Sequence, residues 1–271
     1  VTTLAADCTK CVQQLETYSY DNAGNLDKVS RAGSYLYDYD YDSNGILVRK
    51  SEGSADSGAV LRSSNYEVDP NSGLPLAYTL TEQGKLVQRQ EWSYNARGQT
   101  LTTAQIDPAS GAARITTQRY CEDADVAGGA CPLAGLLLSS IGPRKDIADS
   151  TNYSYYISDD PGCGLVPAVC SYRKGDLWKI TDSLGRGTEY LAYDGAGHAL
   201  STKDANGVIT DYTYNPRGWL SAVKIRGTDV SSEADDRITR IDYWPTGLAK
   251  QVTQPDGCLL YTSPSPRDKR Q

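Results

Sequence analysis

The sequence predicts an all-β protein built from repetitive antiparallel β-hairpins that form a curved sheet. The first observation is a tight-turn pattern, Asp/Asn-x-x-Gly, that recurs along the chain. Asp or Asn at the first turn position bonds the backbone just ahead, and Gly at the fourth accepts a positive φ. The second is the use of 20 Tyr and no Phe, which suits strands with one wetted face. The predicted turns have their Asp/Asn and Gly at Asp21 and Gly24, Asp42 and Gly45, Asn95 and Gly98, Asp182 and Gly185, Asp194 and Gly197, Asp204 and Gly207, and Asn215 and Gly218.

The clearest stretch runs from Trp178 to Leu220. Four of the turns begin in it, spaced 12, 10 and 11 residues apart, with β-prone residues between them. Before the last turn, Thr210, Tyr212 and Tyr214 share one strand face, because successive side chains alternate between the two faces. The pattern is therefore strand, tight turn, strand. A mean hydropathy of −0.51 agrees with a sheet whose two faces are both accessible.

A tyrosine precedes five of the turns, and the interval from Tyr20 to Tyr41 and from Tyr193 to Tyr214 is 21 residues, the length of two strands and two turns. The segments are YSYDNAGNL, YDYDSNGIL, YNARGQTL, YDGAGHAL and YTYNPRGWL. They resemble the YD-repeat, or Rhs-repeat, family, over most of residues 13–257. The resemblance implies that the sheet is part of a spiralling hollow shell, with further repeats at both ends.

Residues 1–12 are interpreted as a lead-in to the repeats, and they contain Cys8 and Cys11. A C-x-x-C pair is half of a zinc site or a redox motif, but zinc needs a second pair of ligands. The chain has one His, His198, which lies inside a repeat turn. We therefore predict no metal site and treat Cys8 and Cys11 as disulfide candidates.

The segment YLYDYDY has an aromatic face and an acidic one. Alternation places Tyr35, Tyr37, Tyr39 and Tyr41 together, and Leu36, Asp38 and Asp40 on the other side. One interpretation is a stacking surface for carbohydrate. The other is a ladder of tyrosines that packs against the neighbouring hairpins.

A Cys-rich insertion interrupts the repeats at about residues 121–171. Its cysteines form two close pairs, Cys121 with Cys131 and Cys163 with Cys170. We predict two disulfides with Cα separations inside the usual range of about 4.4 to 6.8 Å. Disulfides indicate an oxidising compartment and hence a secreted or cell-surface protein. The alternative is a set of free thiols in a cytosolic protein, because Rhs-type proteins also work from the cytoplasm.

Residues 258–271 change character. They place Pro264 and Pro266 beside basic residues and resemble the translated read-through of a sequencing adaptor. We expect this tail to lie outside the fold, since proline removes backbone donors that a sheet needs. Leu259 to Tyr261 are β-prone and could occupy the place of the next repeat strand. The absence of Met and the start inside the pattern indicate a fragment.

Composition and motifs limit the function classes. The net charge of −7 and the absence of basic runs before the tail exclude nucleic acid as a partner. No apolar run has the length of a membrane span. No paired carboxylates, nucleophile elbow or His-centred base is visible, so we predict no enzyme, no catalytic residues and no cofactor.

Two function classes remain. The resemblance implies a bacterial Rhs or polymorphic-toxin scaffold, whose shell encapsulates a C-terminal effector, so that the partners are the remaining repeats and the effector domain. The alternative is a cell-surface adhesin that binds carbohydrate or a surface protein through a Tyr-rich face.

Overall fold

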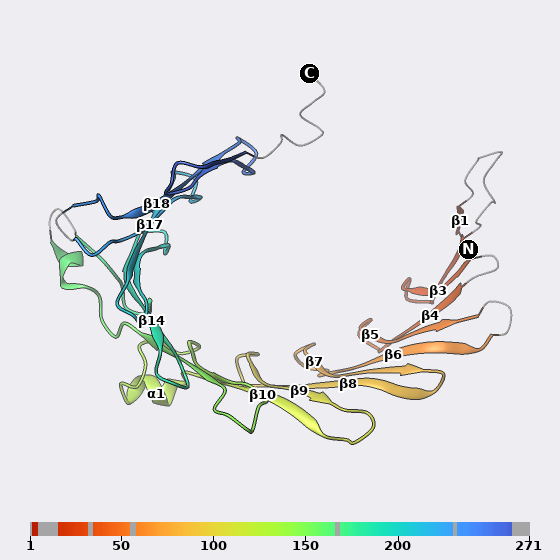
Figure 1. Cartoon of the computed structure of the whole chain (residues 1–271). Helices are drawn as coiled ribbons and strands as arrows, with labels where there is room; N and C mark the ends of the chain where they lie inside the picture. Colours follow the sequence, from red (N-terminus) through yellow and green to blue (C-terminus); the bar gives the residue numbers. More distant parts are fainter. Residues whose placement is uncertain are drawn as a thin grey trace. The chain divides into compact units, whose positions relative to one another are not determined.

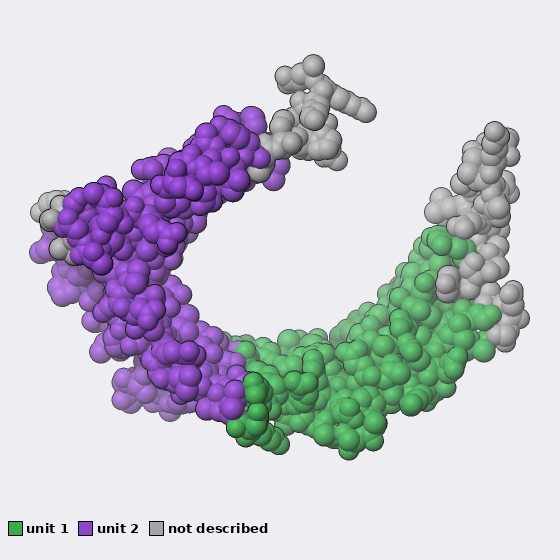
Figure 2. Space-filling view, in the orientation of Figure 1, with its two compact units in different colours: residues 1–118, 141–146 green, residues 119–140, 147–271 purple. Residues whose placement is uncertain are grey.

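The computed structural model describes residues 2–4, 16–31, 35–54, 58–165, 169–229 and 232–261. Backbone contacts divide the chain into two compact units (Figure 2). Unit 1 comprises residues 1–118 and 141–146, and unit 2 comprises residues 119–140 and 147–271. Regular structure in the described ranges is almost entirely antiparallel β-sheet (Figure 1), which confirms the predicted fold class.

Unit 1 is a ladder in which each strand pairs with the next along the chain. All of these pairings are antiparallel. The strands are β1 (Thr2–Leu4), β2 (Glu16–Tyr20), β3 (Leu26–Arg31), β4 (Tyr35–Tyr41), β5 (Leu47–Gly53), β6 (Val60–Val68), β7 (Pro75–Glu82), β8 (Lys85–Tyr94), β9 (Thr100–Ile106) and β10 (Ala113–Tyr120), the last of which runs just past the unit's boundary.

Unit 2 begins with the Cys-rich insertion and continues as a second ladder. The insertion holds a short helix α1 (Asp123–Ala127), strand β11 (Leu137–Ile141) and a 3-10 helix at Pro161–Gly164. From β12 onward each strand pairs antiparallel with the next. These strands are β12 (Ser150–Tyr155), β13 (Leu177–Asp182), β14 (Gly187–Tyr193), β15 (Ala199–Lys203), β16 (Ile209–Tyr214), β17 (Leu220–Ile225), β18 (Arg237–Tyr243), β19 (Ala249–Thr253) and β20 (Leu259–Tyr261).

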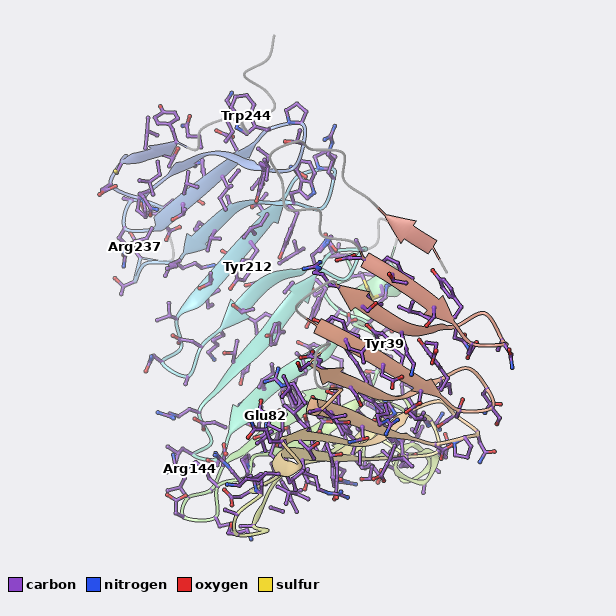
Figure 3. The ribbon with its side chains drawn as sticks, turned by 90° about the vertical axis from the view of Figure 1, so that its right-hand side faces the viewer. Tyr39, Glu82, Arg144, Tyr212, Arg237 and Trp244 are labelled. Atoms are coloured by element: carbon purple, nitrogen blue, oxygen red, sulfur yellow. A yellow bond between two sulfur atoms is a disulfide. The ribbon has the colours of Figure 1, made fainter. Side chains whose placement is uncertain are left out.

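Few side chains are fully buried. The buried residues without a polar side chain in the described ranges are Gly53, Ala77, Ala104, Cys121, Cys131 and Pro132. Side chains project from both faces of the strands (Figure 3), and among the described residues no second sheet lies over either ladder. Stability therefore comes mainly from each hairpin's contacts with its two neighbours, as in other repeat proteins.

The expectation that the β-prone residues after the last turn occupy the place of the next repeat strand is confirmed. Leu259 to Tyr261 form β20, and β20 pairs with β19 in the register Val252 to Leu260. These β-prone residues follow a turn that ends at Cys258, so their backbone continues the ladder. The expectation of no regular structure from Ser263 onward falls on residues 262–271, which lie outside the described ranges.

Candidate functional site

The repeated turns share one five-residue loop, illustrated by the turn at Asp204. The Asp204 N–H donates to Val208 O over 3.0 Å, and the Gly207 N–H donates to Asp204 O over 3.0 Å. The side-chain Oδ1 of Asp204 accepts the N–H groups of Asn206 and Val208 at 2.8 and 2.9 Å. Gly207 has φ of 85°, a left-handed conformation that costs Gly little. One carboxylate oxygen thus satisfies two turn amides.

The same pattern of bonds occurs at the six other turns that the sequence predicts. They begin at Asp21, Asp42, Asn95, Asp182, Asp194 and Asn215. Their glycines at the fourth position also have positive φ. Asp and Asn serve equally because both carry an acceptor oxygen at the same place on the side chain.

The second carboxylate oxygen of a turn Asp binds the fifth residue of its own loop where that residue is polar. Arg186 Nε lies 2.8 Å from Asp182 Oδ2, and His198 Nδ1 lies 2.8 Å from Asp194 Oδ2. The hydrogen bonds from Arg186 and His198 hold the pKa of Asp182 and Asp194 below the usual range for a carboxyl. The only His of the chain therefore has a structural partner inside its turn.

Turns that are preceded by a tyrosine lie along one edge of each ladder, which we call the tyrosine edge. Along it, a tyrosine hydroxyl donates to the carbonyl of the first residue of the strand before its own. Five such bonds are present in the described ranges: Tyr94 to Pro75 at 2.7 Å, Tyr155 to Leu137 at 2.7 Å, Tyr193 to Leu177 at 2.6 Å, Tyr214 to Ala199 at 3.1 Å and Tyr243 to Leu220 at 2.8 Å. Each bond ties the end of one strand to the start of its neighbour, at the point where the chain has just left the preceding loop.

These hydroxyl bonds give a physical reason for the use of tyrosine. Phe would fill the same space but would leave the carbonyl without its donor. Burial raises the pKa of Tyr94, Tyr155, Tyr193 and Tyr214 above the usual value for a phenol. The sequence does not identify the acceptor carbonyls, although the complete absence of Phe is a signal that the hydroxyl matters.

Ring contacts join successive loops along the same edge. The His198 ring stacks on Tyr214 with centroids 4.6 Å apart, and Trp219 lies 5.3 Å from Tyr243. A Cβ on Gly218 would lie 3.2 Å from His198 Cε1, so this glycine leaves room for the ring. The last residue of one loop therefore packs beneath the next loop on that edge.

In the described ranges, the same backbone loop also forms at two turns that have neither Asp nor Asn at the first position. They start at Trp244 and Gln254 and have Gly247 and Gly257 at the fourth position. In the described part of the chain, the buried indole N–H of Trp244 has no hydrogen-bond acceptor. In the sequence, these turns are signalled by Pro245 and Pro255 at the second position together with the glycine at the fourth.

The tyrosine row on β4 is packed against its neighbours. Tyr37, Tyr39 and Tyr41 are half-buried, and the side chain of Tyr35 lies outside the described ranges. Lys50 Nζ lies 4.8 Å from the centre of the Tyr37 ring. Tyr39, labelled in Figure 3, is the cross-strand partner of Lys50. The row therefore contacts the side chains of the next strand.

The acidic face of β4 is neutralised by the strands on either side. Lys28 Nζ lies 3.5 Å from Asp38 Oδ2, and Arg49 contacts Asp40. These are exposed pairs, which contribute at most about 1 kcal/mol each. The acidic face is an ordinary ion-paired sheet surface.

Both disulfides predicted in the insertion are present. Cys121 is joined to Cys131 with a Cα separation of 6.2 Å, and Cys163 to Cys170 with a separation of 4.2 Å. The second value falls just below the predicted interval, while the pair is still bonded. Short loops of this kind limit the freedom of the unfolded chain and stabilise by about 2 to 3 kcal/mol each in the chain-entropy model.

The other three cysteines of the chain are Cys8, Cys11 and Cys258. Cys8 and Cys11 lie outside the described ranges, and Cys258 has an exposed free thiol. No group of His, Cys, Asp or Glu with the geometry of a metal site occurs among the residues described. In the same residues, no helix combines the length and the apolar character needed to cross a bilayer.

Comparison with protein families gives one match. The model of the RHS repeat family matches residues 193–229. This segment contains two successive loops of the tyrosine edge, which begin at Asp194 and Asn215. No curated protein matches the chain.

Solved toxin-complex structures show a distant similarity. The crystal structure of TcdB2-TccC3 without its hypervariable C-terminal region is 17% identical in sequence, with a TM-score of 0.35. The match covers 93% of this chain and 14% of the chain in that structure. A Tc holotoxin pore of Photorhabdus luminescens is 16% identical, with a TM-score of 0.28, and the match covers 89% of this chain and 15% of the pore chain. TcdB2-TccC3-Cdc42 is 15% identical, with a TM-score of 0.24, and the match covers 89% of this chain and 18% of the TcdB2-TccC3-Cdc42 chain. The chain thus spans less than a fifth of each of these proteins.

Proposed function

We propose, on the premise that this chain is a member of the Rhs/YD-repeat family, that residues 13–257 are a non-catalytic scaffold, part of a shell that encapsulates a C-terminal effector. The observation that carries the proposal is the RHS repeat match at residues 193–229, because the loop geometry of that segment recurs in both units. The scaffold role follows from the repeat; the enclosed effector is the proposed step.

The structure of the ladders supports a wall rather than a binding pocket. Side chains on both faces remain accessible, and few are fully buried. Hydrogen bonds and ring contacts along the tyrosine edge hold neighbouring hairpins together without a second layer. A single-layer sheet built in this way encloses volume with little chain, which is what a container needs.

The two disulfides bear on location. Bridges of this kind persist in oxidising compartments and are rare in the cytosol. We propose a secreted or cell-surface protein whose bridges form after it leaves the cytoplasm in which it is made. On this proposal, the shell encloses the effector before the protein leaves the cytoplasm, and the disulfides form afterwards.

The adhesin alternative is weaker. It needs an accessible ring face on β4, and Lys50 lies over the ring of Tyr37. Carbohydrate binding through this face is therefore the second candidate only.

The test uses the complete gene product that contains this chain, with its C-terminal segment in place. We expect limited proteolysis to leave that segment intact while the shell is folded, and to degrade the same segment at once when it is produced alone. Equal cleavage rates for the two forms would refute encapsulation.

An arm of the same experiment tests the adhesin. Residues 13–257 and a Tyr37→Ala/Tyr39→Ala variant are compared on a glycan array. Scaffold function predicts no glycan signal from either protein. A signal that the folded double variant loses would make the adhesin the better reading.

A further inference from the structure

We propose that the Cys163–Cys170 bridge is a reducible latch on the tyrosine edge of unit 2, whereas the Cys121–Cys131 bridge is permanent. Both bridges close short loops of the same insertion. They differ in how far solvent reaches them and in what they hold in place. The chemistry that opens the latch is thiol–disulfide exchange with a dithiol or glutathione-type reductant.

Access separates the two bridges. Cys121 and Cys131 are 0% and 4% exposed. Cys163 and Cys170 are half-buried, and each has an exposed neighbour, Gly164 and Val169. A reductant's thiolate has to reach a sulfur atom before exchange can begin. It reaches the Cys163–Cys170 bridge first.

The Cys163–Cys170 bridge holds the residues just before Cys163 next to the residues just after Cys170. Asp160 Oδ1 accepts the Gly162 N–H at 2.9 Å, and Asp160 Oδ2 accepts the Ser171 N–H at 2.9 Å. The Asp160 N–H donates to Tyr172 O at 3.1 Å. Asp160 lies three residues before Cys163, and Ser171 directly follows Cys170. The bridge therefore keeps the partners of Asp160 within reach.

The residues that follow Cys170 contact Tyr193, one of the tyrosines of the edge. Ser171 O accepts the N–H of Tyr193 at 2.7 Å. The Tyr172 ring stacks on Tyr156 with centroids 3.6 Å apart, and the Tyr156 hydroxyl donates to Tyr190 O at 2.7 Å. Loss of the bridge consequently frees Ser171 and Tyr172, and with them the acceptor of the Tyr193 N–H at the end of β14.

Thiol–disulfide exchange opens the Cys163–Cys170 bridge in two steps. A reductant thiolate attacks one sulfur of the bridge, the S–S bond breaks, and the other cysteine leaves as a thiolate that takes up a proton. The second thiol of a dithiol, or a second glutathione, then displaces the first cysteine from the mixed disulfide. The products are two protein thiols and an oxidised reductant.

The consequence for the shell rests on the proposed function. Entry into a reducing cytosol would loosen one hairpin of the wall while the buried bridge keeps the remainder of the insertion in place. The latch itself needs no effector, so it is tested on this chain alone and fails or stands independently of encapsulation.

The experiment treats the full 271-residue chain, as Cys258→Ala to remove the exposed thiol, with increasing glutathione or dithiothreitol. Cysteine alkylation and mass spectrometry follow each bridge. We expect Cys163 and Cys170 to be labelled roughly tenfold faster than Cys121 and Cys131. Equal rates, or earlier labelling of the buried pair, would overturn the proposal.

Hydrogen exchange at the amide of Tyr193 reports the structural effect. We expect its exchange to rise roughly tenfold on mild reduction and also in an unreduced Cys163→Ser/Cys170→Ser variant. The Asn215 amide, which donates to Trp219 O at 2.9 Å in the next loop, is the control and should not change. An unchanged Tyr193 amide, or equal deprotection of both amides, would contradict a local latch.

Discussion

Replacing both Cys121 and Cys131 by Ala is expected to lower the free energy of unfolding of unit 2 by about 3 kcal/mol. The bridge closes a loop with a sequence separation of 10, so its loss returns conformational freedom to the unfolded chain. Cys121 is also fully buried. Its N–H donates to Leu136 O at 2.8 Å and its carbonyl accepts the Gly135 N–H at 2.7 Å, so the bridge holds the loop that leads into β11.

Denaturant unfolding followed by tryptophan fluorescence measures this effect. Three of the four Trp residues, Trp178, Trp219 and Trp244, lie in unit 2, and Trp92 lies in unit 1. The exposed Cys258→Ala variant serves as the matched control and should be neutral. A loss below about 0.5 kcal/mol in the double variant would show that the bridge adds nothing to folding.

A steep loss of stability above pH 10 is the second large effect. Burial raises the pKa of Tyr155 and Tyr193 above the value of about 10 for an unfolded chain. The folded state therefore holds its phenolic protons more tightly than the unfolded state does. This contribution to stability is fully present below pH 10 and is lost as the pH rises through the raised pKa values. Each such proton contributes a slope of at most about 1.4 kcal/mol per pH unit.

Urea unfolding between pH 9 and about pH 12 measures that slope. A Tyr155→Phe/Tyr193→Phe variant has no phenol to ionise at these sites, so its stability should fall less steeply. Lysine deprotonation affects both proteins alike and cancels in the comparison. Parallel curves for the two proteins would contradict buried, hydrogen-bonded phenols at these positions.

The turns and the bridges were the predictable part of the structure. Asp204 and Gly207 specify a loop through hydrogen bonds and a backbone conformation that involve only residues of the same turn. The turn can therefore be predicted from the local sequence alone. The disulfides were equally local, since Cys163 and Cys170 are neighbours across one short loop. Strand identity followed from the β-prone residues between these turns.

The hydroxyl acceptors could not be predicted in the same way. The bond from Tyr243 to Leu220 O spans 23 positions and depends on the register of two strands. Register is a property of the assembled ladder, so no local pattern names the acceptor. The strand at Leu259 to Tyr261, by contrast, was expected from its β-prone residues, and its pairing with β19 continues the sheet beyond the last turn.

The hydroxyl of Tyr243 tests most directly whether tyrosine bonds hold successive hairpins together. Tyr243→Phe keeps the ring against Trp219 but removes the donor to Leu220 O. Tyr261→Phe is the matched control, because Tyr261 also ends a strand of unit 2 and is 67% exposed. Chemical denaturation should show a loss of about 1 kcal/mol for Tyr243→Phe and none for Tyr261→Phe. Equal stability of Tyr243→Phe and the unmodified chain would contradict the role assigned to the tyrosine edge.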